Sequence, residues 1–181
     1  IFKEIISDKK SKYFTQSGFF RLHDVGFFDE DGYLFIGGRS DDVINVSGHR
    51  ISTSEIESIS ISLDGVIEAC AVATEDKICG SRVILYFSSK LTEDHYLESL
   101  KKDINNIIKT KLTKYHIPKN IFHFQNLPKT KSGKIMRRIM RELLDNDLSG
   151  KKRDYSTLAN KKEFLICRKN YIEYIKRNNN Y

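Results

Sequence analysis

The stretch VIEACAVATEDKICGSRVILYF, residues 66–87, contains the two apolar runs on which the predicted fold is built. Residues 66–73 and 83–87 each have the length of a β-strand, and Gly80-Ser81 lies between them with several charged residues. This pattern predicts two neighbouring strands joined by a turn. The first run also carries alanines at alternate positions, Ala69, Ala71 and Ala73. We expect these small side chains to form a face against which a helix packs closely.

Helices are predicted before and after this pair of strands. Ser54-Glu55-Ile56-Glu57 has the form of a capping box, and an apolar stripe follows it until Asp64-Gly65 ends the helix. A longer helix is predicted from about Thr92 to Leu112 because its leucines and isoleucines recur on one side, and a strand at 121–124 follows. The resulting order of strands and helices predicts a small mixed sheet covered by helices, in the α+β class.

Length and composition narrow the class of protein. The chain has 181 residues, enough to bury a sizeable core, and it begins at Ile1, so we expect it to be a piece of a longer protein. No apolar run approaches the roughly 18–20 residues of a transmembrane helix. Three widely spaced cysteines without a Cys-x-x-Cys pair indicate reduced thiols. With no signal peptide, these features favour a cytoplasmic protein, and the nucleus or an organelle stays open.

Positive charge is concentrated in one segment. Residues 101–141 contain 12 lysines and arginines but a single acidic residue, Asp103. Such a segment attracts a polyanion, which could be a nucleic acid, a membrane surface or a nucleotide cofactor. A basic nucleic-acid-binding module is therefore one candidate function. Against it, no aromatic residue is interleaved with the lysines of 127–141, so we expect no specific nucleic-acid partner.

The most basic part of this segment is a loop followed by a helix. Pro128 and Gly133 indicate an exposed loop. Apolar residues recur after it at four-residue spacing, Ile135, Ile139 and Leu143, and predict an amphipathic helix. Lys134 is thus expected where the loop enters the helix. Its ammonium group and the positive end of the helix dipole would both attract a phosphate or carboxylate oxygen.

The sequence of this loop, LPKTKSGKIMRR at 127–138, closely resembles the C-terminal signature of the acyl-adenylate-forming enzymes. Within that superfamily the chain resembles the C-terminal portion of the AMP-forming acetyl-CoA synthetases. The resemblance implies that Lys134 is the catalytic lysine, which contacts the carboxylate and the α-phosphate while the acyl-adenylate forms.

A second stretch, GRSDDVINVSGHR at 38–50, resembles another signature of the same family. The resemblance implies that Arg39 and Arg50 bind ATP and that Asp41 is the hinge between a large N-terminal domain and a small mobile C-terminal domain. It also implies that the Ser47-Gly48 loop borders coenzyme A. Gly48 suits that place, because a residue without Cβ lets the backbone approach a ligand closely.

Two further positions are compared with the family. Asp24 precedes the turn Asp29-Glu30-Asp31-Gly32, where the family has an aspartate that accepts hydrogen bonds from the ATP ribose; a loop-capping role is the alternative. Lys109 stands near the family's arginine for the 3′-phosphate of coenzyme A, and a lysine keeps the charge but loses the bidentate fork. No metal site is predicted in these residues.

Together, the resemblance implies three parts and one reaction. Residues 1–40 are expected to end a large adenylating domain, residues 41–146 to form the small domain, and residues 147–181 to form a tail with a helix. The implied enzyme is a ligase that uses acetate, ATP with Mg²⁺, and coenzyme A; another short-chain acyl-CoA ligase is the alternative. The chain alone is not expected to be active, because the family's phosphate loop and acyl pocket lie on the larger domain. Lys134 is also a candidate for acetylation and deacetylation by partner enzymes, since acetylation would remove its charge.

Overall fold

The computed structural model describes residues 14, 17–20, 24–144 and 155–178, which divide into two compact units, Ile1–Val43 and Ile44–Tyr181. Unit 1 contains an antiparallel pair, β1 (Asp24–Phe28) and β2 (Leu34–Arg39), and the short 3₁₀ helix η1 (Ser40–Asp42). The predicted turn forms between the two strands. The Asp29 carboxylate accepts hydrogen bonds from the backbone N–H groups of Asp31 and Tyr33, at 3.1 and 2.8 Å.

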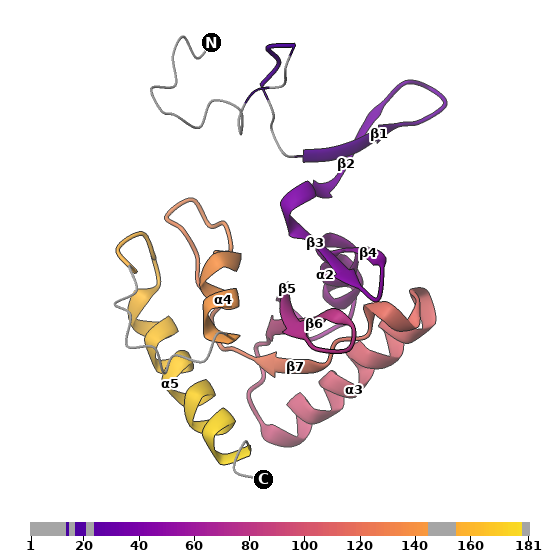
Figure 1. Ribbon diagram of the computed structural model, residues 1–181. Helices are drawn as coiled ribbons and strands as arrows, with labels where there is room; N and C mark the ends of the chain where they lie inside the picture. The colour runs from indigo at the N-terminus through magenta and orange to yellow at the C-terminus, as the bar shows by residue number, and fades with distance from the viewer. Residues whose placement is uncertain (1–13, 15–16, 21–23, 145–154, 179–181) are drawn as a thin grey trace. The chain divides into compact units, whose positions relative to one another are not determined.

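Unit 2 is built on a five-stranded mixed sheet (Figure 1). Its strands are β3 (Val43–Val46), β4 (His49–Ser52), β5 (Glu68–Asp76), β6 (Gly80–Ser88) and β7 (Asn120–His123). The antiparallel pair β5–β6 is the predicted hairpin and runs without a break from Glu68↔Ser88 to Asp76↔Gly80. The other edge of β6 is shared: β3 pairs with its beginning, and β7 pairs in parallel with its later residues.

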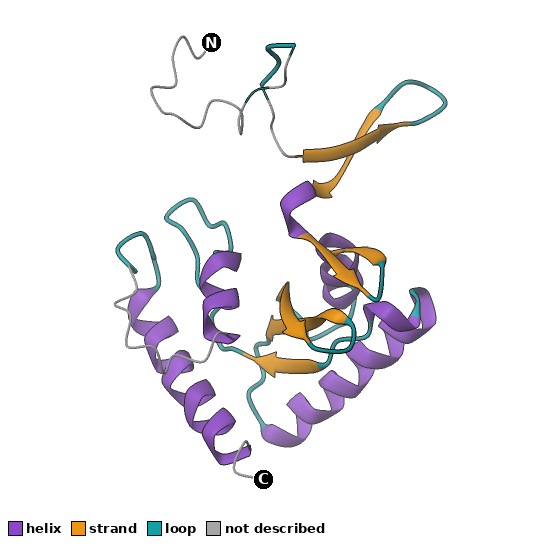
Figure 2. Cartoon of the chain, viewed as in Figure 1, coloured by secondary structure: helices purple, strands orange, loops and turns teal. Residues whose placement is uncertain are grey.

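Successive side chains of β5 and β6 point to opposite faces of the sheet and so belong to two hydrophobic layers. Ala69, Ala71 and Leu85 pack on one face, and Cys70 and Tyr86 pack on the other. The first face is covered by α2 (Thr53–Ile61) and α3 (Asp94–Lys111), and the second by α4 (Arg137–Leu144) and α5 (Lys161–Asn178) (Figure 2). The predicted α+β fold with helices over a mixed sheet is confirmed, and so is close helix packing on the alanines.

The predicted beginnings of two helices are wrong. α2 begins at Thr53 with Ser52 as its N-cap, so the expected capping box at 54–57 does not form. Ser54 lies inside the first turn instead, and its hydroxyl is 2.7 Å from the hydroxyl of Ser52. α4 begins at Arg137 rather than near Ile135. In the residues described, no helix has the length and apolar character needed to cross a membrane.

Candidate active-site loops

The basic loop before α4 is a tight hairpin. Lys129 and Ile135 form an antiparallel bridge, and the backbone N–H of Thr130 donates to the carbonyl of Lys134 at 2.9 Å. The N–H of Gly133 donates back to the Thr130 carbonyl at 2.9 Å, and Gly133 has a φ of +83°. A turn that closes on a left-handed residue is the three-residue hairpin loop in which glycine is favoured.

Lys134 follows this turn and is exposed to solvent. Its backbone N–H donates to the Thr130 hydroxyl at 3.1 Å, so the main chain at Lys134 is held from within the loop. The predicted position at the entry to the helix is wrong. The N–H of Met136 donates to the Pro128 carbonyl at 2.8 Å, which keeps the chain in the hairpin until α4 begins at Arg137. The rigid support of Lys134 is therefore the hairpin.

A segment far along the chain holds the outer edge of the same hairpin. Thr130 forms an antiparallel bridge with Leu158, and the N–H of Ala159 donates to the Lys129 carbonyl at 2.9 Å. The Asn160 amide accepts from the Lys129 N–H at 3.0 Å and donates to the Leu127 carbonyl at 2.7 Å. Residues 155–160 were not predicted to lie here, because the contacts join positions about 30 apart and leave no local pattern in the sequence.

The second loop is the two-residue turn between β3 and β4. Ser47 has a φ of +50° and Gly48 a φ of +84°, the pair of positive values that a type I′ hairpin turn requires. Among the described residues, Ser47 is the one non-glycine with positive φ. A Cβ at Gly48 would meet nothing within 4 Å, so the turn itself accounts for this glycine and the space beside it is open.

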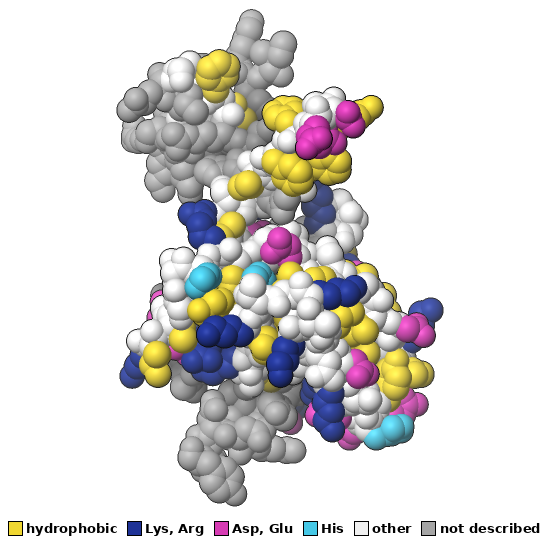
Figure 3. All heavy atoms as spheres, turned by 90° about the vertical axis from the view of Figure 1, so that its right-hand side faces the viewer, with side chains coloured by type: hydrophobic (Ala, Val, Ile, Leu, Met, Phe, Trp, Pro, Cys, Tyr) yellow, Lys and Arg dark blue, Asp and Glu magenta, His cyan; other side chains and the backbone are white. Residues whose placement is uncertain are grey.

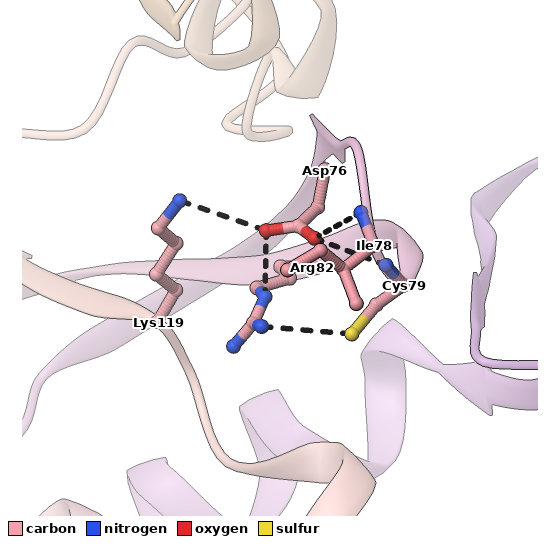
Figure 4. Close-up of polar contacts among 5 residues, drawn as sticks. All are labelled: Asp76, Ile78, Cys79, Arg82 and Lys119. Atoms are coloured by element: carbon pink, nitrogen blue, oxygen red, sulfur yellow. Dashed lines mark hydrogen bonds and ion pairs between the residues drawn. The ribbon is translucent and has the colours of Figure 1, made fainter.

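The Ser47-Gly48 turn is anchored to the turn between β5 and β6. The N–H of Ser47 donates to the carbonyl of Cys79 at 2.9 Å. Figure 4 shows what holds Cys79: one oxygen of the Asp76 carboxylate accepts from the N–H groups of Ile78 and Cys79, both at 3.0 Å. The side chain of Asp76 is only 11% exposed, which shields these bonds from water.

Two cations complete the environment of Asp76. The Nε of Arg82 lies 2.7 Å from its other carboxylate oxygen, and the Nζ of Lys119 lies 3.7 Å away (Figure 4). The pKa of Asp76 is lowered from its ordinary value, first by the hydrogen bond from the Cys79 N–H, then by that from Ile78, and further by Arg82. Asp76 was not predicted, because a single aspartate in a turn has no distinctive spacing.

The remaining residues predicted in unit 2 lie near the β3–β4 hairpin or along α3. Arg50 is exposed on β4, and Lys109 is exposed in the last turn of α3. The helix η2 (Lys114–His116) follows α3 and packs on β4, where the rings of His49 and Tyr115 stack with centroids 3.8 Å apart. Figure 3 shows lysine and arginine side chains spread over the face that carries β4 and the end of α3.

Unit 1 brings its two predicted ATP-binding residues together. Asp24 and Arg39 are paired in the β1–β2 register, and their charged groups lie 3.8 Å apart. Both side chains are partly exposed, at 40% and 48%, so the pair is accessible to a ligand. Asp41, the predicted hinge, lies in η1 beside the boundary between the two units.

Comparison with known proteins identifies the fold of unit 2. Residues 55–134 match the family described as the AMP-binding enzyme C-terminal domain, a match that ends at Lys134. This chain carries an AMP-binding enzyme C-terminal domain. The expected relation to the acyl-adenylate-forming enzymes is therefore confirmed.

Among relatives of this AMP-binding enzyme C-terminal domain is acetyl-coenzyme A synthetase 2 of Candida albicans. It is 43% identical over 149 residues, which cover 82% of this chain and 21% of that protein. The chain thus spans about a fifth of the length of the curated relatives it matches.

Solved structures of related enzymes are similar to this chain over most of its length. ATP-bound MatB from Rhodopseudomonas palustris has a TM-score of 0.67 at 26% identity, covering 77% of this chain and 27% of that one. The o-succinylbenzoate-CoA synthetase MenE from Bacillus subtilis, in complex with its acyl-adenylate intermediate, has a TM-score of 0.62 at 28% identity, covering 72% and 26%.

Within this domain the two loops belong to opposite layers of the sheet. Residues beside the Ser47-Gly48 turn, Val46 and Ile51, pack with α2 and α3. Leu127 and Ile139, on either side of the Lys134 hairpin, pack with α4 and α5. The two loops accordingly lie on opposite sides of unit 2 in Figure 1. In the part of the chain that the structure describes, no group of three or more His, Cys, Asp or Glu side chains could hold a metal ion.

Proposed function

We propose that this chain is the C-terminal part of an AMP-forming acetate–CoA ligase, which makes acetyl-CoA, AMP and pyrophosphate from acetate, ATP and coenzyme A. The observation that carries the proposal is Lys134, which is exposed, held by a rigid hairpin and located at the end of the match to the AMP-binding C-terminal family. The similarity to acetyl-coenzyme A synthetase 2 over 82% of the chain favours acetate as the acid. Another short-chain acyl-CoA ligase is the alternative.

In the first half-reaction, a carboxylate attacks the α-phosphorus of ATP and pyrophosphate leaves. Both reactants are anions, so the main task is to hold them together and to stabilise the negative charge of the transition state. An ammonium group next to the turn of an exposed hairpin can be inserted between a carboxylate and a phosphate. We assign this role to Lys134. Magnesium would arrive with ATP, and no step by this chain's residues depends on it.

The second half-reaction transfers the acyl group from AMP to the thiol of coenzyme A. We assign the coenzyme A side to the Ser47-Gly48 turn and Lys109, with Arg50 on the nucleotide phosphate. The open space beside Gly48 supports close approach by a ligand. Because the Lys134 hairpin and this turn lie on opposite layers of unit 2, one orientation of the unit can present only one of them to a single reaction centre. We therefore propose that unit 2 pivots at Asp41 between the half-reactions.

Residues 1–40 would then end a larger adenylating domain, ahead of the small domain at 41–146 and the tail at 147–181. Support comes from the β1–β2 hairpin, whose large apolar side chains are exposed, Phe27 by 62%, Phe28 by 70% and Ile36 by 63%. Such exposure is typical of a surface that packs against another part of a protein. The accessible pair Asp24–Arg39 would bind ATP at that domain, with Asp24 on the ribose.

A nucleic-acid-binding module is not favoured. The basic segment matches an enzyme family, and its hairpin has no aromatic side chain on which a base could stack. We place the proposed enzyme in the cytoplasm. The exposure of Lys134 also supports a role as an acetylation site for a partner enzyme, since the ammonium group is accessible in this unit.

The test is acetate-dependent exchange of pyrophosphate into ATP by the full-length protein that contains this chain. Lys134→Ala should raise the activation free energy of exchange by about 3 kcal/mol, the usual scale for losing a preorganised charge donor, and so slow the exchange by roughly a hundredfold. Lys131→Ala is the matched control, because Lys131 is exposed on the same hairpin and should leave the rate unchanged. Formation of acetyl-CoA from supplied acetyl-adenylate should survive in both variants. Exchange at the wild-type rate in Lys134→Ala would exclude the assigned role.

A further inference from the structure

We propose that Asn160 is a positioning residue for Lys134, so that the segment 155–160 is part of the adenylation machinery. The proposal rests on the function assigned to Lys134 above. Asn160 lies 26 positions after Lys134 in the chain and reaches the hairpin only through the tertiary structure. Nothing in the basic loop itself indicates that it needs a distant partner.

The amide of Asn160 uses both of its functional groups on one strand of the hairpin. Its oxygen accepts from the Lys129 N–H at 3.0 Å, and its nitrogen donates to the Leu127 carbonyl at 2.7 Å. The two contacts flank Pro128, whose ring nitrogen has no N–H to donate. The paired contacts fix the direction in which the chain enters the turn that carries Lys134.

Asn160 directly precedes α5, a position where the side chain of an asparagine ordinarily has another role. The Asn160 carbonyl accepts from the Phe164 N–H at 3.0 Å, the first bond of α5, so Asn160 stands at the N-cap. An asparagine there commonly caps the first turn of its own helix. Here its amide is committed to Leu127 and Lys129 instead, so this side chain joins α5 to the hairpin.

The segment before Asn160 is itself anchored in the core. Leu158 is 6% exposed and Phe164 is fully buried, and both belong to the layer that contains Leu127 and Ile139. The Asn160 amide is therefore held by a packed element. A side chain on a packed element can restrict a loop, whereas one on a loose tail would move with it.

The restraint passes to Lys134 through two short steps. Lys129, held by Asn160, bridges to Ile135, the residue after Lys134. Thr130, next to Lys129, forms a β-bridge with Leu158 on one edge, and its N–H donates to the carbonyl of Lys134 on the other. Residues 129–130 are thus the middle strand between residues 134–135 and residues 158–159, and removal of the Asn160 contacts loosens the strand that supports Lys134.

The first experiment measures hydrogen exchange in the chain itself. Asn160→Ala should raise the exchange rates of the Lys129, Thr130 and Lys134 amides about tenfold, while β5 and β6 keep their protection. Asn170→Ala is the matched control, since Asn170 is an exposed asparagine on α5. Unchanged exchange in the hairpin of Asn160→Ala would overturn the proposal whatever reaction the protein catalyses.

The second experiment compares the half-reactions in the full-length protein. Asn160→Ala should lower kcat for adenylation about tenfold, because a small misplacement of a reacting group lowers the rate strongly. It should leave thioester formation from supplied acetyl-adenylate within about twofold of wild type. Asn160→Asp keeps the acceptor for the Lys129 N–H but replaces the donor to the Leu127 carbonyl with a carboxylate oxygen, so it should restore adenylation only in part.

The experiments distinguish a failure of the proposed function from a failure of the positioning role of Asn160. If the wild-type protein does not adenylate acetate and Lys134→Ala makes no difference to any tested acid, the proposed function is wrong, and hydrogen exchange alone decides whether Asn160 orders the hairpin. If the wild type is active and Asn160→Ala reduces both half-reactions equally, Asn160 only stabilises the fold and the positioning role is overturned. Adenylation within twofold of wild type in Asn160→Ala overturns it as well.

Discussion

Glu57 offers a direct test of how the two helical layers are joined. This residue of α2 is buried, and its carboxylate accepts from the N–H of Ala71 at 2.8 Å, on the edge strand β5. The other carboxylate oxygen pairs with the guanidinium of Arg137, the first residue of α4. The carboxylate therefore protects an otherwise open strand edge and links α2 to α4.

The expected loss of unfolding free energy depends on which polar groups each variant leaves without a partner. Glu57→Ala leaves a buried N–H at Ala71 without its acceptor, which costs about 1–3 kcal/mol. The ion pair adds about 1 kcal/mol, because the Arg137 side chain is 30% exposed and solvent screens its charge. We expect a total loss of about 3 kcal/mol of unfolding free energy for Glu57→Ala. Glu57→Gln keeps an acceptor for Ala71 and should lose only about 1 kcal/mol.

Urea denaturation of the chain, followed by circular dichroism, measures these differences. Glu98→Ala is the matched control: its carboxylate is 64% exposed in a surface pair with Lys101, and its removal should change stability by about 0.5 kcal/mol or less. A cycle with Arg137→Met isolates the pair, with an expected coupling of about 1 kcal/mol. If Glu57→Ala unfolds at the same urea concentration as the Glu98 control, the carboxylate does not support the strand edge and our reasoning is refuted.

Two further predictions concern the turns. Gly48→Ala should destabilise the chain by about 1–2 kcal/mol because alanine must adopt the left-handed conformation, although its Cβ would meet no neighbour. Gly133→Ala, also left-handed and with open space at its Cβ, should lower stability by the same amount but should impair adenylation rather than thioester formation. Equal effects on both half-reactions would contradict the assignment of the loops. Asp76→Asn should flatten the acid side of the stability profile. Because the pKa of Asp76 in the folded chain lies below its ordinary value of 3.8, the ionised carboxylate stabilises the fold above that pH, and the stabilisation is lost as pH falls through the folded pKa. Thermal melts of wild type and variant between pH 2 and pH 7 measure this, and parallel profiles would show that Asp76 does not contribute.

Short-range patterns allowed much of unit 2 to be predicted. The alternation along 66–73 and 83–87 depends only on neighbouring residues, since side chains at alternate positions of a strand share a face. It predicted the hairpin β5–β6 and the helix packed on the alanines, and both are confirmed. The signature at 127–138 likewise indicated the family, because its residues are consecutive and their order carries the resemblance.

The sequence by itself therefore determined the fold class, the family and the place of Lys134 in an exposed loop. The tertiary structure alone decided what holds that loop and where the next helix begins. Asn160 meets Lys129 across 31 positions and Glu57 meets Arg137 across 80, and neither separation has a helical or strand period. Such contacts exist because the folded sheet places the elements that carry them next to one another: a hydrogen bond between remote groups depends on the packing of those elements and not on the residues beside them in the chain.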